Sequence, residues 1–530
     1  MANIYLNMLN NLRILFILIV IGLLTHFQTL KFGLFGDDWQ AIYWYLSQET
    51  VGGYFNNLPG LLKYLTQYGG QLLLTGIAYD LFGSNYSYYY ITSLLFKITA
   101  SFSLYLLIKK LTVVEPEHNI AFIPLISAIL FLAGITGIQT TDFVVQMGVF
   151  LAAALSFLSI YLLYQSIELK SMQNGLISLI LGTLAIVIAP IRLFPFILIF
   201  PASILFIYQI YGSRKNLWLI FILFLTWIFI VSSLWYIGVF SAPGQISLSY
   251  ISALKQFVSV LTSNPLILVL TFFQWLGVVI IPDQFIANKN LQTTIGSLFV
   301  FLSISAFFLL RKEREGFFKL TISAIPLIFF LMLMFIYSSG RMMSSEDRYL
   351  VMIFYGFCLF FAVAIIISSR SKSKLLKQIS TFLVIFLVSL IFIHVTQLQV
   401  LYGSWLNNGR GSAFIRNTEK IFTNSFPTQL NDNKIIYLDF DNTKTLYFIQ
   451  YGLDFKLLVL TNTFQQKYFP AVIIDRMQII ERMQKISPSE HQNIISNIHS
   501  YSLKNGLFWD STDNFRKDLQ IELKLTSKDI

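Results

Sequence analysis

Apolar segments about as long as a membrane-spanning helix recur along this chain from Leu12 to Val400. A helix needs about 20 consecutive, mostly apolar residues to cross the hydrocarbon core of a bilayer. The 530 residues are 56% hydrophobic and only 12% charged, which is too apolar for a water-soluble protein of this length. The sequence therefore predicts an all-α polytopic membrane protein.

About eleven of these segments are long enough to be spans. They are Leu12–Leu30, Tyr86–Ile108, Ile120–Ile138, Phe143–Tyr164, Gly175–Ile191, Leu193–Tyr211, Trp218–Phe240, Thr293–Leu310, Leu320–Ser338, Leu350–Ser369 and Phe382–Val400. A further apolar segment, Asn264–Pro282, conflicts as a full crossing with the charges on either side of it. It is predicted to be re-entrant or interfacial, unless Ser247–Thr262 also crosses, which would raise the count to about thirteen.

The net charge is +11, and the basic residues lie mainly in short clusters between the apolar segments. This distribution argues against a nucleic-acid partner and indicates topology instead, because cytoplasmic loops carry an excess of Lys and Arg. Placing the clusters in the cytoplasm puts loops 31–85, 139–142, 241–291 and 339–348 on the outer side. We expect a multi-pass protein of the plasma (inner) membrane with its functional site facing away from the cytoplasm.

Two domains are predicted, a transmembrane domain over residues 1–400 and an extracytoplasmic α/β domain over residues 401–530. Within the first outer loop, Ala41–Leu46 and Leu58–Leu81 mix aromatic, apolar and polar residues at helical spacing. We expect both to be helices lying in the membrane interface.

The carboxy-terminal part has a polar and charged composition. Apolar residues alternate at Lys434–Phe440 and Leu446–Gln450, which predicts strands. Ala471–Ile486 is predicted to be a helix.

Two adjacent carboxylates, Asp37 and Asp38, follow a glycine just beyond the first apolar segment. Adjacent acids repel each other, so near a membrane surface one of them can have a raised pKa that suits a general base while the other orients it. The alternative is a solvated helix cap, since Asp is a favoured N-cap residue.

A third acid, Asp142, lies in the short polar run Thr140-Thr141-Asp142 between two predicted spans. It is a candidate for supporting a catalytic acid or for helping to bind a divalent metal ion. The alternative is that it caps the following helix. The sequence leaves the need for a metal ion open.

Three arginines are candidates for binding a phosphate group. Arg192 lies between two apolar segments and is flanked by prolines, and an arginine enclosed in this way normally has a partner. Arg341 and Arg348 lie in the polar loop before the segment that starts at Leu350. The alternatives are an Arg192 that extends to lipid head groups and an Arg348 that pairs with acids of its own loop.

These residues, in this order, resemble the GT-C superfamily of membrane glycosyltransferases, particularly its protein-mannosyltransferase and aminoarabinose-transferase branch. The resemblance covers residues 1–400 as architecture. Its motifs are the acidic pair Asp37-Asp38, an arginine near proline at Arg192, and the run Arg348-Tyr349-Leu350. The chain departs from the pattern in that Pro195 comes three residues after Arg192 and no proline occurs from Val351 to Phe360.

The resemblance implies that a sugar passes from a polyprenyl-phosphate donor to an acceptor, which is a glycan, a lipid or a protein, with inversion at the anomeric carbon. Asp37 would be the base and Asp38 would position it. Arg192 or Arg348 would stabilise the departing lipid phosphate. A carrier with its tail in the bilayer also explains why such an enzyme is embedded in the membrane.

Two other functions remain open from the sequence. An O-antigen polymerase or ligase also joins lipid-linked glycans on the outer face, but it usually has a large late outer loop rich in arginine. A transporter or flippase would distribute charges through the bilayer, and Lys97 is a charge near the middle of a predicted span. The chain has no P-loop that would indicate ATP-driven transport.

Overall fold

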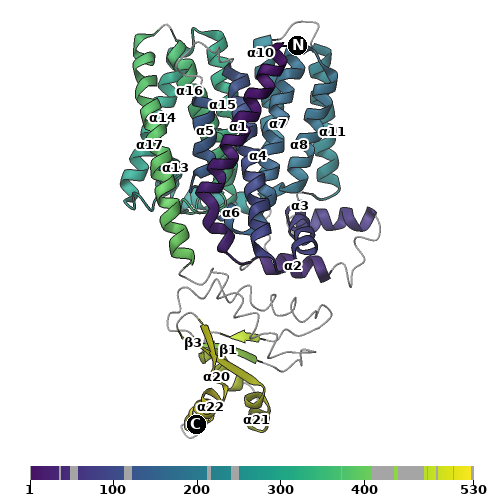
Figure 1. The fold of residues 1–530 in the computed structure, drawn as a ribbon, viewed down its shortest axis with the longest axis vertical. Helices are drawn as coiled ribbons and strands as arrows, with labels where there is room; N and C mark the ends of the chain where they lie inside the picture. The colour runs from purple at the N-terminus through teal and green to yellow at the C-terminus, as the bar shows by residue number, and fades with distance from the viewer. Residues whose placement is uncertain are drawn as a thin grey trace. The chain divides into compact units, whose positions relative to one another are not determined.

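A computed structural model describes residues 2–34, 37–47, 58–112, 122–211, 217–239, 250–371, 373–406, 435–439, 471–473, 476–484, 487–504 and 507–526 (Figure 1). The chain forms two compact units. The first, called the membrane unit, comprises residues 1–29, 62–73 and 89–401, and the second comprises residues 30–61, 74–88 and 402–530.

Helices account for the described part of the chain up to residue 405 almost completely. They are α1 (Ala2–His26), η1 (Phe27–Lys31), α2 (Asp37–Ser47), α3 (Leu58–Phe82), α4 (Tyr86–Thr112), α5 (Ile123–Ala133), α6 (Gln139–Asp142), η4 (Val144–Gln146), α7 (Met147–Leu169), α8 (Met172–Ile188), α9 (Pro190–Leu193), α10 (Phe196–Tyr211), α11 (Leu217–Tyr236), α12 (Tyr250–Ser263), α13 (Pro265–Ile280), α14 (Lys289–Leu310), α15 (Arg314–Tyr337), α16 (Val351–Arg370) and α17 (Lys374–Trp405). Among the described residues, nine helices are long and apolar enough to cross a membrane. The chain is therefore a multi-pass, largely α-helical membrane protein.

Two of the predicted spans do not coincide with a helix long enough to cross a membrane. Ile120–Ile138 contains only the 11-residue helix α5, and Gly175–Ile191 overlaps the 17-residue helix α8. Helix α5 ends at Gly134, and α8 ends just before Pro190, whose ring fixes φ and removes a backbone donor. The other nine predicted spans coincide with the nine long helices.

Helices α12 and α13 form a bent pair in place of one straight span. The two axes differ by 117° across a break at Asn264, as in a broken span or a re-entrant loop. This agrees with the prediction that Asn264–Pro282 is not an ordinary crossing. Counting the pair as one span would bring the total among the described residues to ten.

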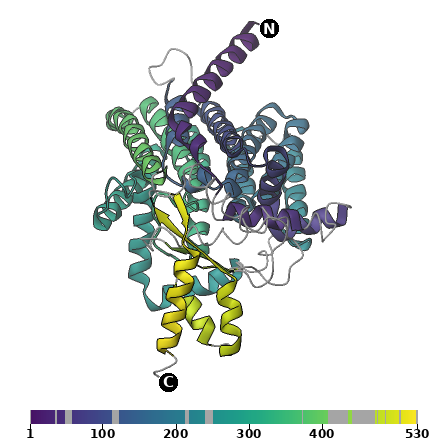
Figure 2. The ribbon, with the colours of Figure 1, turned by 60° about the horizontal axis from the view of Figure 1, so that its bottom comes forward.

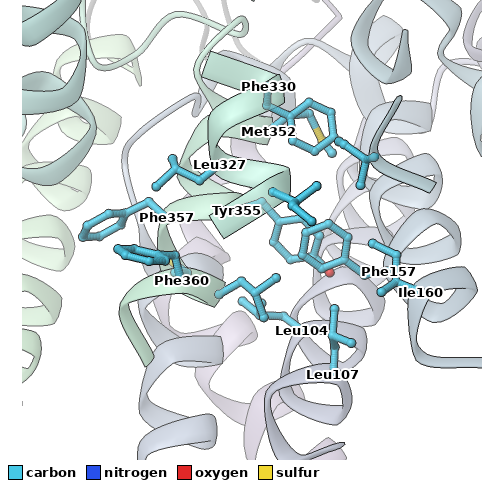
Figure 3. Packing of buried hydrophobic residues seen from close by; sticks show 14 of the residues in the cluster. Leu104, Leu107, Phe157, Ile160, Leu327, Phe330, Met352, Tyr355, Phe357 and Phe360 are labelled. Atoms are coloured by element: carbon cyan, nitrogen blue, oxygen red, sulfur yellow. The ribbon is translucent and has the colours of Figure 1, made fainter. Parts of the chain in front are cut away.

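Helix α16 is the centre of the membrane unit, because its whole apolar length is buried by other helices. Tyr355 on this helix stacks on Phe157 of α7, with ring centroids 3.9 Å apart, as Figure 3 shows. The Tyr355 hydroxyl donates a hydrogen bond to the backbone carbonyl of Ala100 on α4 (2.6 Å). Lipid tails are as apolar as these side chains, so close packing and such hydrogen bonds hold the helices together.

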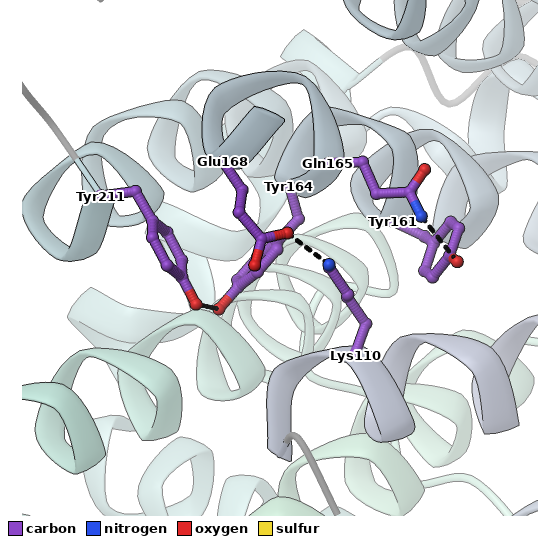
Figure 4. A network of polar contacts seen from close by, with 6 residues as sticks. All are labelled: Lys110, Tyr161, Tyr164, Gln165, Glu168 and Tyr211. Carbon is purple, nitrogen blue, oxygen red and sulfur yellow. Dashed lines mark hydrogen bonds and ion pairs between the residues drawn. The ribbon is translucent and has the colours of Figure 1, made fainter. Parts of the chain in front are cut away.

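A polar network joins α4, α7 and α10 at the ends of these helices that carry the basic clusters (Figure 4). Lys110 pairs with Glu168 and lies 5.5 Å from the centre of the Tyr164 ring. The Tyr164 and Tyr211 hydroxyls are hydrogen bonded at 2.6 Å. Tyr164 is fully buried, whereas Lys110 and Glu168 are only partly withdrawn from solvent.

The carboxy-terminal elements form a small α/β domain. They are β1 (Ile435–Asp439), β2 (Ala471–Ile473), α20 (Arg476–Gln484), α21 (Pro488–Ser496), β3 (Ile498–Lys504), β4 (Leu507–Asp510) and α22 (Thr512–Thr526). The strand order is β2-β1-β3-β4, with β1 parallel to β2 and β3, and β3 antiparallel to β4. Figure 2 shows β3, β4 and these helices towards the yellow end of the colour range.

The predictions for the outer loop and for this domain were partly correct. Both loop segments predicted to be helices lie in α2 and α3, and Lys434–Phe440 contains β1. The prediction of one helix over Ala471–Ile486 was wrong, because its β-branched start pairs with β1 as strand β2 and the helix begins only at Arg476. The predicted strand Leu446–Gln450 lies outside the described residues.

Candidate functional site

The membrane unit contains a break in its helical path between α5 and α6. The chain leaves the helix after Ala133 and resumes helical structure at Gln139. Gly137 has a φ of +73°, and a Cβ atom added there would lie 2.6 Å from the Cα atom of Val351. Glycine is therefore required both by its conformation and by the close approach of α16.

Two histidines from distant helices satisfy backbone groups at this break. His26 at the end of α1 donates a hydrogen bond from Nε2 to the carbonyl of Leu132 (2.8 Å). On the other side, Nδ1 of His394 in α17 accepts from the backbone N–H of Ile135 (3.3 Å), and its Nε2 donates to the carbonyl of Ile280 (3.2 Å). Irregular backbone at this depth is tolerated only where the protein supplies such partners.

Three loops meet at the loop junction, which we define as residues 134–142, 282–288 and 339–350. The backbone N–H of Gly137 donates to the carbonyl of Ser345 (2.6 Å), and that of Gln139 to the carbonyl of Glu346 (3.1 Å). Ser345 in turn donates from its backbone N–H (2.9 Å) and its hydroxyl (2.6 Å) to Oδ1 of Asp283. The junction holds Asp142 and Arg348 on a connected frame.

Asp142 is the last residue of α6, and its side chain is fully buried. The alternative that it caps the next helix is wrong, because Phe143 is the N-cap of η4 and Gln146 is the N-cap of α7. The negative charge of Asp142 acts on Lys97, which is also buried. An opposite charge nearby offsets part of the cost of burying a charge in the membrane unit.

Lys97 has further neighbours in the same interior. Its Nζ lies 3.5 Å from Nε2 of His26 and 5.6 Å from the centre of the Phe150 ring. The hydroxyl of Ser93, one turn before Lys97 on α4, donates to the carbonyl of Thr141 (3.2 Å). Helix α4 is thereby fixed to the segment that carries Asp142.

Arg192 is buried, with 6% of its surface exposed, so it does not extend to the lipid head groups. Its guanidinium carbon lies 3.7 Å from the centre of the Tyr349 ring, which is a close cation–π stack. Within the part of the chain that the structure describes, its Nη1 has no hydrogen-bond partner. Prolines at 190 and 195 interrupt the helices around it and place it on the short helix α9.

Arg348 directly precedes Tyr349, the residue on which Arg192 stacks. The charges of both arginines act on the hydroxyl of Tyr337, whose ring lies 5.8 Å from that of Tyr349. Arg348 is half-buried, whereas the side chain of Arg341 is exposed. The carbonyl of Arg341 accepts from the indole of Trp275 (2.8 Å), so the structure gives Arg341 a place in the loop frame.

The acidic pair begins helix α2, in the second unit. Asp38 is fully buried and Asp37 is half-buried, so Asp38 is not a solvated cap. The adjacent Trp39 donates its indole N–H to the carbonyl of Leu34 (3.2 Å) and packs edge-on against Tyr86. These contacts fix the start of the helix and with it the direction in which the two acids point.

The sequence left the need for a divalent metal ion open. Within the described ranges, no three His, Cys, Asp or Glu side chains lie close enough together to bind a metal ion.

Sequence reasoning missed His26, His394 and Tyr349 as parts of the site. The histidines gave no signal, because their partners are backbone groups far away in sequence. Tyr349 directly follows Arg348 in the run Arg348-Tyr349-Leu350. Its stacking on Arg192, however, depends on the approach of α9 to the start of α16.

Comparison of the sequence with protein-family models and with curated proteins gives no match.

Proposed function

We propose that this chain transfers a sugar from a polyprenyl-phosphate donor to an acceptor hydroxyl at the outer face of the membrane, with inversion at the anomeric carbon. The observation that carries the proposal is Arg192, a buried guanidinium stacked on Tyr349 with one nitrogen left to donate. A planar guanidinium matches a phosphate in geometry and charge. A phosphate attached to a membrane lipid is an anion that can reach a guanidinium buried in the membrane unit.

The arginines stabilise the leaving group in this proposal. Arg192 donates to the donor phosphate, and Arg348 adds a second positive charge in the same surroundings. As the bond between the anomeric carbon and the phosphate oxygen breaks, its electron pair stays on the phosphate. The two cations offset the negative charge that develops there.

The acidic pair activates the acceptor. Asp37 is partly accessible and takes the proton of the acceptor hydroxyl while that oxygen bonds to the anomeric carbon. Asp38 is buried and positions Asp37 through the first turn of α2. Attack opposite to the departing phosphate inverts the anomeric carbon.

Full-length protein, incubated with a panel of radiolabelled polyprenyl-phosphate sugars, tests the proposal. Transfer or hydrolysis by the wild type should be lost in Asp37→Asn. In Arg192→Met it should fall by about ten- to a hundredfold, because a hydrogen bond to a charged group contributes about 1.5–3 kcal/mol. Arg192→Lys should recover only part of the rate, because lysine lacks the planar fork.

Arg311→Met is the matched control. Its guanidinium also stacks on an aromatic ring, 4.1 Å from the centre of Phe308, but it is exposed and belongs to a predicted cytoplasmic cluster. Its activity should equal that of the wild type. An Arg192→Met protein that folds and transfers sugar at the wild-type rate would refute the role of Arg192, and the absence of turnover with every donor would favour a polymerase, a ligase or a transporter.

A transporter or flippase is the second candidate, because Lys97, His26, Asp142 and His394 are all buried in the membrane unit. Charges inside the bilayer are typical of ion and substrate paths. Reconstituted vesicles distinguish the two functions. A transporter would move a labelled lipid-linked sugar across the bilayer without breaking its phosphate bond.

A further inference from the structure

One face of the carboxy-terminal sheet carries polar and aromatic side chains in two rows. Residues paired across neighbouring strands point to the same face, so the strand register places each row directly. The first row is Tyr437, Ser500 and Ser511, on β1, on β3 and just after β4. The second row lies two residues further along β1 and β3, towards their carboxyl ends. It consists of Asp439, Ser502 and Trp509.

The first row is covered by the helical layer. Phe515 of α22 stacks on Tyr437, with ring centroids 4.4 Å apart, and Ser500 is buried. The Ser500 and Ser511 hydroxyls are hydrogen bonded at 2.9 Å, and the backbone N–H of Ser500 donates to the hydroxyl of Thr512 (3.0 Å). This row is part of the folded core of the domain.

The second row is not covered. Asp439 is exposed, Ser502 is half-buried, and the Trp509 side chain is 59% exposed. The Ser502 hydroxyl lies 3.1 Å from the Ser511 hydroxyl and 3.4 Å from Oδ2 of Asp439. The row thus presents a carboxylate, hydroxyls and an open indole side by side on a rigid sheet.

The row lies where α/β sheets commonly bind ligands. Strand β1 has β2 on one side and β3 on the other, and it is parallel to both. Asp439 is the last residue of β1, so the row reaches the carboxyl end of the parallel part of the sheet, outside which open α/β sheets bind their ligands.

We propose that Asp439, Ser502 and Trp509 form a saccharide-binding platform. A pyranose ring has a face of C–H groups that stacks on an indole and a rim of hydroxyls that donate to a carboxylate and exchange hydrogen bonds with serine. The platform would bind the glycan part of an acceptor or of a growing product. In that role it rests on the proposed transferase function, whereas saccharide binding itself can be measured without turnover.

The charge of the row favours a saccharide over two other ligands that contact tryptophan. A nucleotide would also stack on the indole, but Asp439 would repel its phosphates. An exposed tryptophan can also anchor a protein at a membrane surface. Asp439 opposes that role at the anionic head groups of a membrane.

The full-length protein should be reconstituted in nanodiscs, since common maltoside detergents are themselves saccharides. Saturation-transfer-difference NMR with short neutral oligosaccharides of glucose, galactose, mannose or N-acetylglucosamine should detect saturable binding. Trp509→Ala should weaken the affinity by about tenfold or more, as for a central aromatic anchor. Trp509→Phe should recover part of it, and Asp439→Asn should weaken it as well.

Ile521→Ala is the matched control, because Ile521 on α22 is an equally exposed apolar side chain at 59%. It should bind as the wild type does. No binding of any oligosaccharide, or binding unchanged in Trp509→Ala, would overturn the platform. Quenching of the Trp509 fluorescence by brominated lipids, taken as the difference from Trp509→Phe, would overturn it in favour of a membrane anchor.

The two proposals can fail separately. Saccharide binding that depends on Trp509, in a protein that does not turn over any lipid-linked sugar, would leave the platform standing and remove the transferase. Sugar transfer by the wild type without any measurable binding to the platform would support the transferase and overturn the platform.

Discussion

Replacing His394 with alanine should destabilise the membrane unit strongly, although His394 lies on a helix that otherwise faces lipid over much of its length. The fully buried imidazole bonds to the backbone N–H of Ile135 and the backbone carbonyl of Ile280, and its ring stacks on Phe354 at 5.2 Å. Removing it leaves two buried backbone groups without their partner. Each costs about 1–3 kcal/mol, so the expected loss is about 2–6 kcal/mol.

Reversible unfolding in mixed micelles, followed by circular dichroism, measures this free energy. His394→Gln tests the origin of the effect, because its amide offers both a donor and an acceptor and should recover part of the stability. Thr396→Ala on the same helix is the control. The Thr396 hydroxyl bonds only to carbonyls of its own helix, so its removal should cost little.

A loss below about 0.5 kcal/mol in His394→Ala, or equal losses in His394→Ala and Thr396→Ala, would refute this reasoning. Small values are a real alternative in membranes, since side-chain hydrogen bonds between helices average about 0.6 kcal/mol there. We expect a larger loss of stability here because the two partners of His394 are backbone groups at a break between helices. Without the imidazole, these groups cannot form a replacement hydrogen bond within a helix.

Three further perturbations separate the forces in the fold. Gly137→Ala should cost about 1–2 kcal/mol from its left-handed backbone conformation, and the clash with α16 should add to this cost. Gly83 has a φ of +52°, and no atom lies within 4 Å of an added Cβ. Gly83→Ala should therefore show the backbone cost alone in the same unfolding assay. Tyr355→Phe should lose about 0.5–1.5 kcal/mol with its interhelical hydrogen bond, seen as a lower midpoint of thermal unfolding. Lys110→Met should lose at most about 1 kcal/mol, because its pair with Glu168 is partly exposed, and added salt should reduce the difference from wild type.

The long helices could be predicted from the sequence because the bilayer imposes one length and one composition on every span. The segments that were predicted incorrectly have local causes. The mean hydropathy of a sequence window does not detect such causes. Helix α5 stops at Gly134, where a Cβ atom would lie 2.3 Å from the Phe354 ring, and only the approach of α16 makes that glycine decisive. The start of strand β2 was predicted as helix because its partner β1 is distant in sequence.

The candidate site could be predicted as a set of residue types but not as an arrangement. Arg192, Arg348 and Asp142 were selected because charges are costly near apolar segments, and all three lie in the membrane unit. The stacking of Arg192 on Tyr349 and the attraction of Asp142 for Lys97 join residues that are distant in sequence. No pattern in one sequence encodes such pairs, because they arise from tertiary packing.

The pair formed by Lys97 and Asp142 allows structure and chemistry to be separated by a double-mutant cycle. Both side chains are buried and the charge of Asp142 acts on Lys97, so Lys97→Met and Asp142→Asn should each destabilise the protein by about 1–3 kcal/mol, the cost of leaving a buried polar group unsatisfied. The double variant buries no charge at this position and should lose less than the sum of the two, by at least about 0.5 kcal/mol. Additive losses would mean that the two charges do not stabilise each other. If Asp142 also supports sugar transfer, the double variant should regain stability but not activity, whereas a purely structural pair should regain both.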